Sequence, residues 1–124
     1  MIDLLKRPAT WLVIFLFVSL ATISVAKQPD IDAIPKKALI VDVRTPSEFR
    51  TGHFPGSVNI PLADFRSRLA EFGGKDQLIV VYCRSGNRSG IVKGLLEASG
   101  YKRVSNGGGL DTMMRLAPTP TALK

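Results

Sequence analysis

Cysteine, histidine and tryptophan each occur only once in this chain of 124 residues. A single cysteine excludes an intramolecular disulfide, a C-x-x-C redox pair and a cysteine-ligated zinc site. His53 is the sole histidine and has no companion ligands, so we predict no metal site. Three roles remain for Cys83: a reactive nucleophile, a buried inert side chain, or a partner in an intermolecular disulfide.

Long apolar runs are also scarce, and the longest lies near the N-terminus. Lys6 and Arg7 precede an apolar run that ends at about Ile23, and Ser24-Val25-Ala26 satisfies the small-x-small rule for signal cleavage. We expect residues 1–26 to be a signal peptide and the protein to be periplasmic or secreted. The alternative is a retained membrane anchor, because the segment is nearly as long as the ~20 residues that cross a bilayer. The domain would then be anchored to the inner membrane, outside the cytoplasm.

The rest of the composition is typical of one globular domain. The chain is 45% hydrophobic and 22% charged, without the bias of a disordered protein. Its formal net charge is +7, and the cations are spread along the sequence without interleaved aromatic residues. They include Lys36, Lys37, Arg66, Arg68, Lys75, Lys102 and Arg103. We interpret them as a solvated surface that steers small anions, and we predict no nucleic-acid partner.

The most informative stretch runs from Leu78 to Gly100. Its first residues, Leu78 to Tyr82, are apolar and rich in β-branched side chains, which predicts a buried strand. Apolar residues then recur at helical spacing from Ile91 to Ala98, and Gly100 ends that helix. Cys83 lies between the strand and the helix. We expect a thiolate in that position to be surrounded by backbone N–H groups and by the positive end of the helix.

The residues after Cys83 suit a bound anion. Arg84 and Arg88 supply positive charge, and Gly86 allows the backbone to curl so that its amides point inward. Beside cations and a helix N-terminus, the pKa of a cysteine falls from about 8.5 to roughly 3.5–7.5. We therefore predict that Cys83 is the catalytic nucleophile. The predicted substrate-binding loop comprises Arg84, Ser85, Gly86, Asn87, Arg88 and Ser89.

Two motifs resemble the rhodaneses, a family of sulfurtransferases. Residues 83–89 read C-x-x-G-x-R-S, which is similar to the active-site loop of single-domain rhodaneses. Residues 41–61 resemble that family's D-V-R-x-x-x-E-[YF]-x-x-G-H-[IF]-P-G-[AS]-x-N-[IL]-P signature. The resemblance covers about Ile34 to Leu116. It implies a rhodanese fold and thiosulfate sulfurtransferase activity without a cofactor, and the expected signal peptide would make the protein an exported member.

Four residues of the second motif are expected to support the site without reacting. We expect Asp42 to bond nearby loop amides and Arg44 to pair with Glu48, so that together they hold the floor of the site. His53 is the only histidine that could act as a general base. In the family pattern, however, the histidine at this position resembles a residue that fixes the conformation of its loop.

Strand and helix patterns alternate along the chain, which predicts an α/β fold with a mainly parallel central sheet and helices on both faces. Strands are expected at residues 38–43, 58–60, 78–82 and 101–104. Helices are expected near residue 45, from Pro61 to Phe72, before Gly100, and at 110–114 after a glycine turn at 107–109. The expected organisation after the signal peptide is an N-terminal arm at 27–37, a rhodanese domain at 38–117 and a flexible tail at 118–124.

The expected reaction is a two-step transfer of sulfane sulfur through a Cys83 persulfide. The donor would be thiosulfate or a similar small anion, and the acceptor a thiophilic molecule such as cyanide. One alternative is a non-catalytic or sulfur-carrier binding module, a role that some rhodanese-like domains serve. Another is a cysteine phosphatase, but the phosphatase loops that resemble this one are one residue longer between cysteine and arginine. The sequence predicts no oligomeric state.

Overall fold

The computed structural model describes residues 28–118 of the chain. The expected signal peptide, residues 1–26, lies outside the described residues, as does all of the expected tail except Pro118. Within the described part, no helix is long and apolar enough to cross a membrane.

Four parallel strands form one sheet in the order β2-β1-β3-β4. They are β1 (Leu39–Asp42), β2 (Val58–Asn59), β3 (Ile79–Cys83) and β4 (Val104–Gly109). β3 lies between β1 and β4, and all five of its residues are buried. A continuous apolar run is expected for a strand that is covered on both faces, and the carboxyl ends of the strands meet at one edge of the sheet.

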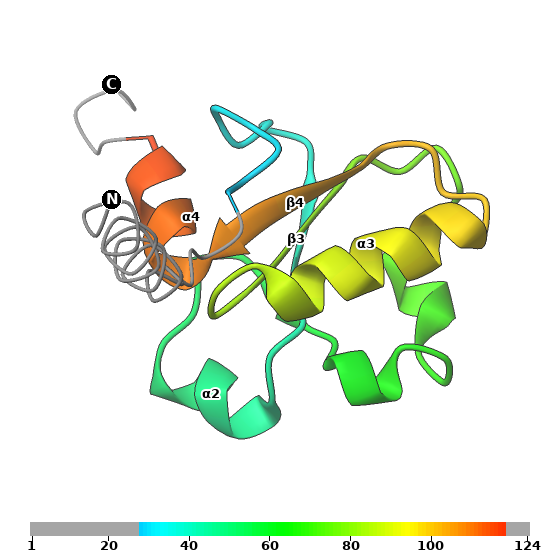
Figure 1. Ribbon diagram of the computed structural model, residues 1–124, viewed down its shortest axis with the longest axis horizontal. Coiled ribbons are helices and arrows are strands. Elements are labelled where there is room, and N and C mark those ends of the chain that lie inside the picture. Colours follow the sequence, from blue (N-terminus) through cyan, green and yellow to red (C-terminus); the bar gives the residue numbers. More distant parts are fainter. Residues whose placement is uncertain (1–27, 119–124) are drawn as a thin grey trace, which may run out of the picture.

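Helical segments cover both faces of the sheet. They are α2 (Pro46–Thr51), the 3-10 turns η1 (Leu62–Asp64) and η2 (Leu69–Phe72), α3 (Asn87–Ala98) and α4 (Leu110–Leu116). Alternate residues of β3 point to opposite faces, so that Val81 packs with α3 and Val80 packs with Met113 of α4. In Figure 1, α3 runs alongside β3 and β4. The predicted α/β fold, with a parallel sheet and helices on both faces, is confirmed.

The helix predicted from Pro61 to Phe72 does not form as one element. The segment folds as η1 and η2, with turns between them. The Ser67 hydroxyl donates to the Asp64 carbonyl, a local bond that competes with helix propagation. Phe65 and Phe72 nevertheless reach the core, because spacings of three and four residues also bring side chains to one side of successive turns. Tertiary packing therefore determined the conformation of this segment, as it does for most short helices.

The last strand also differs from its prediction. It runs from Val104 to Gly109 and includes the glycines that we expected to turn, whereas Tyr101 precedes it in a loop. A β-carbon on Gly107 would collide with the Met113 side chain, and one on Gly109 would collide with the Arg84 carbonyl. The glycines therefore bring β4 into close contact with its neighbours instead of ending it.

Residues 28–37 form neither helix nor strand. Ile31 and Ile34 pack on the core beneath α4, and the Asp30 amide donates to the Asn106 carbonyl at 2.8 Å. This part of the N-terminal arm is thus bound to the sheet at β4.

Candidate active site

Cys83 is the last residue of β3, and α3 begins four residues later at Asn87. Between them, Gly86 adopts a left-handed conformation with φ of 90°. A residue with a side chain is strained in that conformation, so the tight reversal requires glycine. The reversal brings the backbone of the loop back toward the cysteine side chain.

The Cys83 sulfur accepts hydrogen bonds from this loop and helix. The Gly86 amide donates at 3.0 Å and the Ser89 hydroxyl lies 3.4 Å from Sγ. Burial by itself raises the pKa of the thiol, but hydrogen bonds from Ser89, Ser85 and Gly86 lower it further than burial raises it. The net pKa of Cys83 therefore lies below its ordinary value, which favours the nucleophilic thiolate.

Arg88 holds its place through an ion pair with Glu48 of α2. Its Nη1 and Nη2 atoms donate to the Glu48 carboxylate at 2.7 and 3.0 Å. Its hydrogen bond to Glu48 raises the pKa of Arg88, and the charge of Cys83 raises it further. The same ion pair, together with bonds from Thr45, lowers the pKa of Glu48 to about 2. The pair thus fixes a positive charge near the thiol.

The expected pair between Arg44 and Glu48 is not formed. Arg44 instead makes a bidentate pair with Asp42, with its Nη2 at 2.6 Å and its Nε at 3.0 Å from the carboxylate. The backbone amide of Arg44 also donates to the Asp42 carboxylate. Asp42 therefore bonds one loop amide, as predicted. Residues two apart at a strand end share a face, so they meet directly. Glu48 is left to bind Arg88, forty positions away in the sequence.

Tyr82 is a supporting residue that the sequence analysis missed. Its buried hydroxyl donates to Asp42 at 2.9 Å, accepts from the Phe54 amide and lies 3.0 Å from the Ser57 hydroxyl. Arg44 also donates to the Gly52 carbonyl. Together these bonds hold the loop between α2 and β2 against the sheet. A tyrosine within an apolar strand was the available signal, since its buried hydroxyl needs a partner.

Asn59 and Asn106 were also missed, because single polar residues in short strands carry no pattern. Asn59 donates to the carbonyls of Asp42 and Arg44, which fixes the turn after β1. Asn106 lies on β4 and bonds the Ser89 hydroxyl at 2.7 Å. Both side chains support the carboxyl edge of the sheet.

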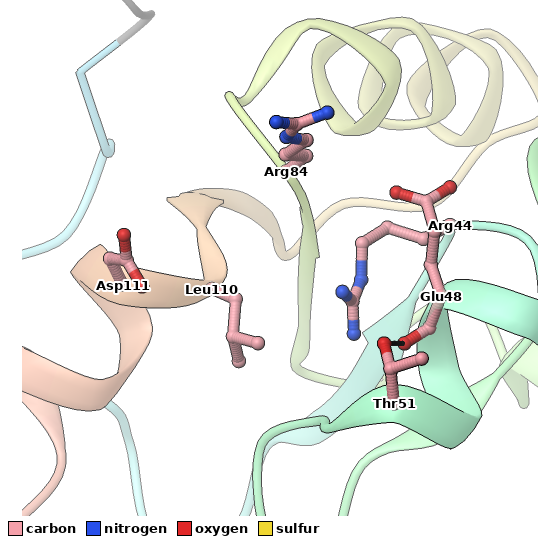
Figure 2. A pocket seen from close by; sticks show the side chains of 6 residues that line it. All are labelled: Arg44, Glu48, Thr51, Arg84, Leu110 and Asp111. Atoms are coloured by element: carbon pink, nitrogen blue, oxygen red, sulfur yellow. Dashed lines mark hydrogen bonds between the residues drawn. The ribbon is translucent and has the colours of Figure 1, made fainter.

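A pocket of about 320 Å³ opens beside the Cys83 loop. Figure 2 shows Arg84 projecting from the loop, with Arg44, Glu48 and Thr51 on one side of the opening and Leu110 and Asp111 of α4 on the other. Of the predicted loop residues, Arg84 and Asn87 are exposed, whereas Gly86 and Ser89 are buried against the sulfur. Cys83 itself has no exposed surface.

His53 lies at the end of α2, exposed to solvent. Its ring stacks on that of Phe49, with 3.6 Å between the centroids, and its Nδ1 is 2.9 Å from the Phe49 carbonyl. These contacts fix the loop that follows α2. Residues 28–118 contain no group of three or more histidine, cysteine, aspartate or glutamate side chains that could hold a metal ion.

Comparison with known proteins shows which proteins this chain is similar to. Thiosulfate sulfurtransferase PspE of Escherichia coli is 39% identical over 71 residues, which are 56% of this chain and 68% of PspE. A sulfurtransferase of Allochromatium vinosum is 41% identical over 68 residues, which are 55% of this chain and 63% of that protein. The solved structure of an E. coli rhodanese with anions is 37% identical with a TM-score of 0.58, covering 60% of this chain and 89% of that one.

Residues 27–111, well over half of the chain, match the family described as the rhodanese-like domain. The match includes the whole Cys83 loop and every element that supports it, from the arm to the start of α4. The chain therefore belongs to the rhodanese-like family of sulfurtransferases.

Proposed function

We propose that this protein is a thiosulfate sulfurtransferase in which Cys83 carries the transferred sulfur as a persulfide. The observation that carries the proposal is the bonding of Sγ, where the Gly86 amide and the Ser89 hydroxyl converge on one buried sulfur. Donors arranged in this way stabilise a negative sulfur more than a neutral one. The similarity to PspE supports thiosulfate as the donor.

In the first step, the Cys83 thiolate attacks the outer sulfur of thiosulfate. A new bond forms between Sγ and that sulfur as the sulfur–sulfur bond of thiosulfate breaks, and sulfite leaves with the electron pair. The product is a Cys83 persulfide anion. No proton is removed from carbon or from a hydroxyl group, so the reaction needs no histidine base, and the position of His53 on the Phe49 ring is compatible with it.

In the second step, a thiophilic acceptor attacks the terminal sulfur. With cyanide, a carbon–sulfur bond forms, the sulfur–sulfur bond breaks, and thiocyanate departs while the Cys83 thiolate is restored. Ser85, Gly86 and Ser89 provide the hydrogen bonds that lower the pKa of Cys83, so they also favour it as the leaving group. Both half-reactions use the same donors.

Arg84 is the proposed binding residue for the anionic donor. It is exposed in the opening beside Cys83, whereas Arg44 and Arg88 are occupied by Asp42 and Glu48. Because Cys83 has no exposed surface, the donor must displace part of the loop, and Arg84 is the side chain that would move with it. Asn87, exposed at the start of α3, is assigned to the same rim.

Export to the periplasm, with cleavage after Ala26, is part of the proposal. It rests on the charge and apolar pattern of residues 1–26. Expression of the full chain followed by N-terminal sequencing of the periplasmic fraction tests it, and the expected first residue is Lys27. A protein that keeps Met1 and sediments with the membrane would indicate a retained anchor instead.

Intact mass spectrometry tests the persulfide directly. Incubation with thiosulfate should add the mass of one sulfur atom, subsequent cyanide should remove it, and Cys83→Ser should show neither change. A stable adduct with slow turnover would favour a sulfur carrier over an enzyme. No adduct would contradict the proposed chemistry and favour a binding module, after which a phosphatase substrate should be assayed.

A further inference from the structure

A buried asparagine lies between the sheet and the Cys83 loop. The Asn106 side chain on β4 has no exposed surface. Its Oδ1 accepts from the Ser89 hydroxyl at 2.7 Å and from the Gly108 amide at 2.9 Å, and its Nδ2 donates to the Gly86 carbonyl at 3.0 Å. A polar side chain is stable at this depth only with such partners. Here, two of the three partners belong to the active-site loop and the first turn of α3.

These two partners are the residues that bond the sulfur. Gly86 donates its amide to Sγ at 3.0 Å, and the Ser89 hydroxyl lies 3.4 Å from it. Asn106 fixes the carbonyl of Gly86, and thereby the peptide that follows the donating amide. Asn106 therefore contacts both residues that bond the sulfur.

The Ser89 hydroxyl has one proton and two acceptors within reach. Asn106 Oδ1 is the nearer, and the thiol of uncharged Cys83 is a weak competitor for the proton. When Cys83 ionises, the bond to the anion is the stronger one, and rotation of the hydroxyl proton alone delivers it. Asn106 therefore holds the Ser89 oxygen facing the sulfur while Cys83 is uncharged, and in the thiolate form its bond to the Gly86 carbonyl keeps the loop aligned. Without this acceptor, a helical serine can turn to a carbonyl of its own helix.

The N-terminal arm in turn fixes the backbone of Asn106. Asp30 donates its amide to the Asn106 carbonyl at 2.8 Å and accepts from the Asn106 amide at 2.9 Å. Lys93 of α3 pairs with the same Asp30 carboxylate at 2.9 Å. The asparagine is therefore held by the arm, the sheet and the helix, and its side chain has little freedom.

We propose that Asn106 is a positioning residue for Cys83, which aligns the Gly86 amide and the Ser89 hydroxyl on the sulfur. The proposal rests on the proposed function only in treating Cys83 as the nucleophile. β4 contains no charged side chain. Asn106 therefore affects the thiol by aligning its hydrogen-bond donors and not by adding charge. The charged groups on the other elements around the site are Asp42 at the end of β1, Arg44 after that strand, Glu48 on α2, Arg84 in the loop, Arg88 on α3 and Asp111 on α4.

The rate of Cys83 alkylation by iodoacetamide, measured against pH, tests this role. Cys83 is the only cysteine, so the mass of the labelled protein reports on it alone. Asn106→Ala should raise the midpoint of the profile by about one pH unit, as expected when the hydrogen bond from the Gly86 amide to the charged sulfur is weakened. In the Ser89→Ala background, the same substitution should still raise the midpoint, because the route through the Gly86 carbonyl remains.

Asn59→Ala is the matched control, since Asn59 also donates to two backbone carbonyls but does not bond Gly86 or Ser89. It should lower stability without moving the profile. Asn106→Ser, which replaces the carboxamide with a single hydroxyl group, should give an intermediate shift. It is the variant to measure if Asn106→Ala does not fold. A folded Asn106 variant with an unchanged or lowered midpoint would overturn the proposal. Alkylation needs no sulfur donor, so failure to form a persulfide would count against the proposed function alone.

Discussion

At the scale of single residues, the site depends on the geometry around one sulfur atom. Gly86 can take the left-handed conformation that turns its amide toward Cys83, and Ser89 follows one turn later on α3. Burial opposes ionisation of the thiol, and these hydrogen bonds outweigh it. Nearby charge comes from Arg88, whereas Arg84 stands at the opening. The two arginines therefore lie in different surroundings.

Replacement of Arg84 should affect donor binding and leave the thiol intact. Arg84→Ala should raise the KM for thiosulfate by roughly tenfold or more, because a charge-assisted hydrogen bond contributes about 1.5–3 kcal/mol. Steady-state kinetics at several thiosulfate concentrations measure this effect. Arg84→Lys should recover part of it through charge alone. An unchanged KM in a folded Arg84→Ala protein would show that the donor is bound elsewhere.

At the scale of elements, α2 and α3 are joined by the pair between Glu48 and Arg88. Glu48→Gln should lower the free energy of unfolding at neutral pH by up to about 1 kcal/mol, since both side chains are about one-third exposed. The folded pKa of Glu48, about 2, lies below its ordinary value of 4.5. The pair therefore stabilises the fold above pH 4.5, and this contribution is lost as the pH falls toward 2.

Thermal melts of the wild-type and Glu48→Gln proteins at pH 7 and at pH 2.5 test this pH dependence of stability. The difference in Tm between wild type and Glu48→Gln should be larger at pH 7 and should shrink at pH 2.5. Glu71→Gln is the control, because Glu71 pairs with Arg68 on an exposed surface and joins no two elements. A Glu48→Gln difference that grows on acidification would have the wrong sign for this pair.

The contact between β4 and the active-site loop depends on the absence of a side chain at Gly109. Its φ of −92° is open to any residue, so Gly109→Ala would be opposed only by contact with the Arg84 carbonyl. We expect a loss of about 1–3 kcal/mol in unfolding free energy and slower alkylation of Cys83, because the loop must move.

Urea unfolding and thiol labelling measure these two effects. Gly94→Ala is the comparison, since it lies in α3 with open space at the β-carbon and should stabilise the protein by roughly 0.5–1 kcal/mol. Wild-type stability and labelling in Gly109→Ala would refute the importance of this contact.

At the scale of the whole molecule, a buried polar cluster joins three separate parts of the chain. Tyr82 on β3 bonds Asp42 at the end of β1, and Phe54 and Ser57 in the loop before β2. Asp42 also holds Arg44, which reaches Gly52. No buried side-chain nitrogen or oxygen in residues 28–118 lacks a hydrogen-bond partner, so the removal of one member leaves others unsatisfied.

Tyr82→Phe should therefore be costly although it removes a single oxygen atom. We expect a loss of about 1–3 kcal/mol, seen as a lower urea midpoint with an unchanged m-value. Tyr101→Phe should cost less, because the shorter hydrogen bond of the Tyr101 hydroxyl, 2.8 Å to the Gly73 carbonyl, is only partly buried. Equal losses for the two variants would show that the cluster adds nothing beyond single hydrogen bonds.

Local sequence determined the elements with strong, local signals. The buried strands β1 and β3, the helix α3 and the loop from Cys83 to Ser89 could all be predicted, because apolar periodicity and glycine chemistry act over a few residues. Parallel strands also require crossovers, so the fold class followed from their alternation with helices. Cys83 could be proposed as the nucleophile for the same reason, since its neighbours in sequence are its neighbours in space.

Only the tertiary structure decided which distant groups meet. It paired Arg44 with Asp42 and Glu48 with Arg88, divided the segment after Pro61 into two turns, and carried β4 through its glycines. It also placed Asn106 beside Ser89, seventeen positions away. Side chains such as these satisfy their hydrogen bonds with whatever packing brings within about 3 Å, and sequence spacing does not encode that distance.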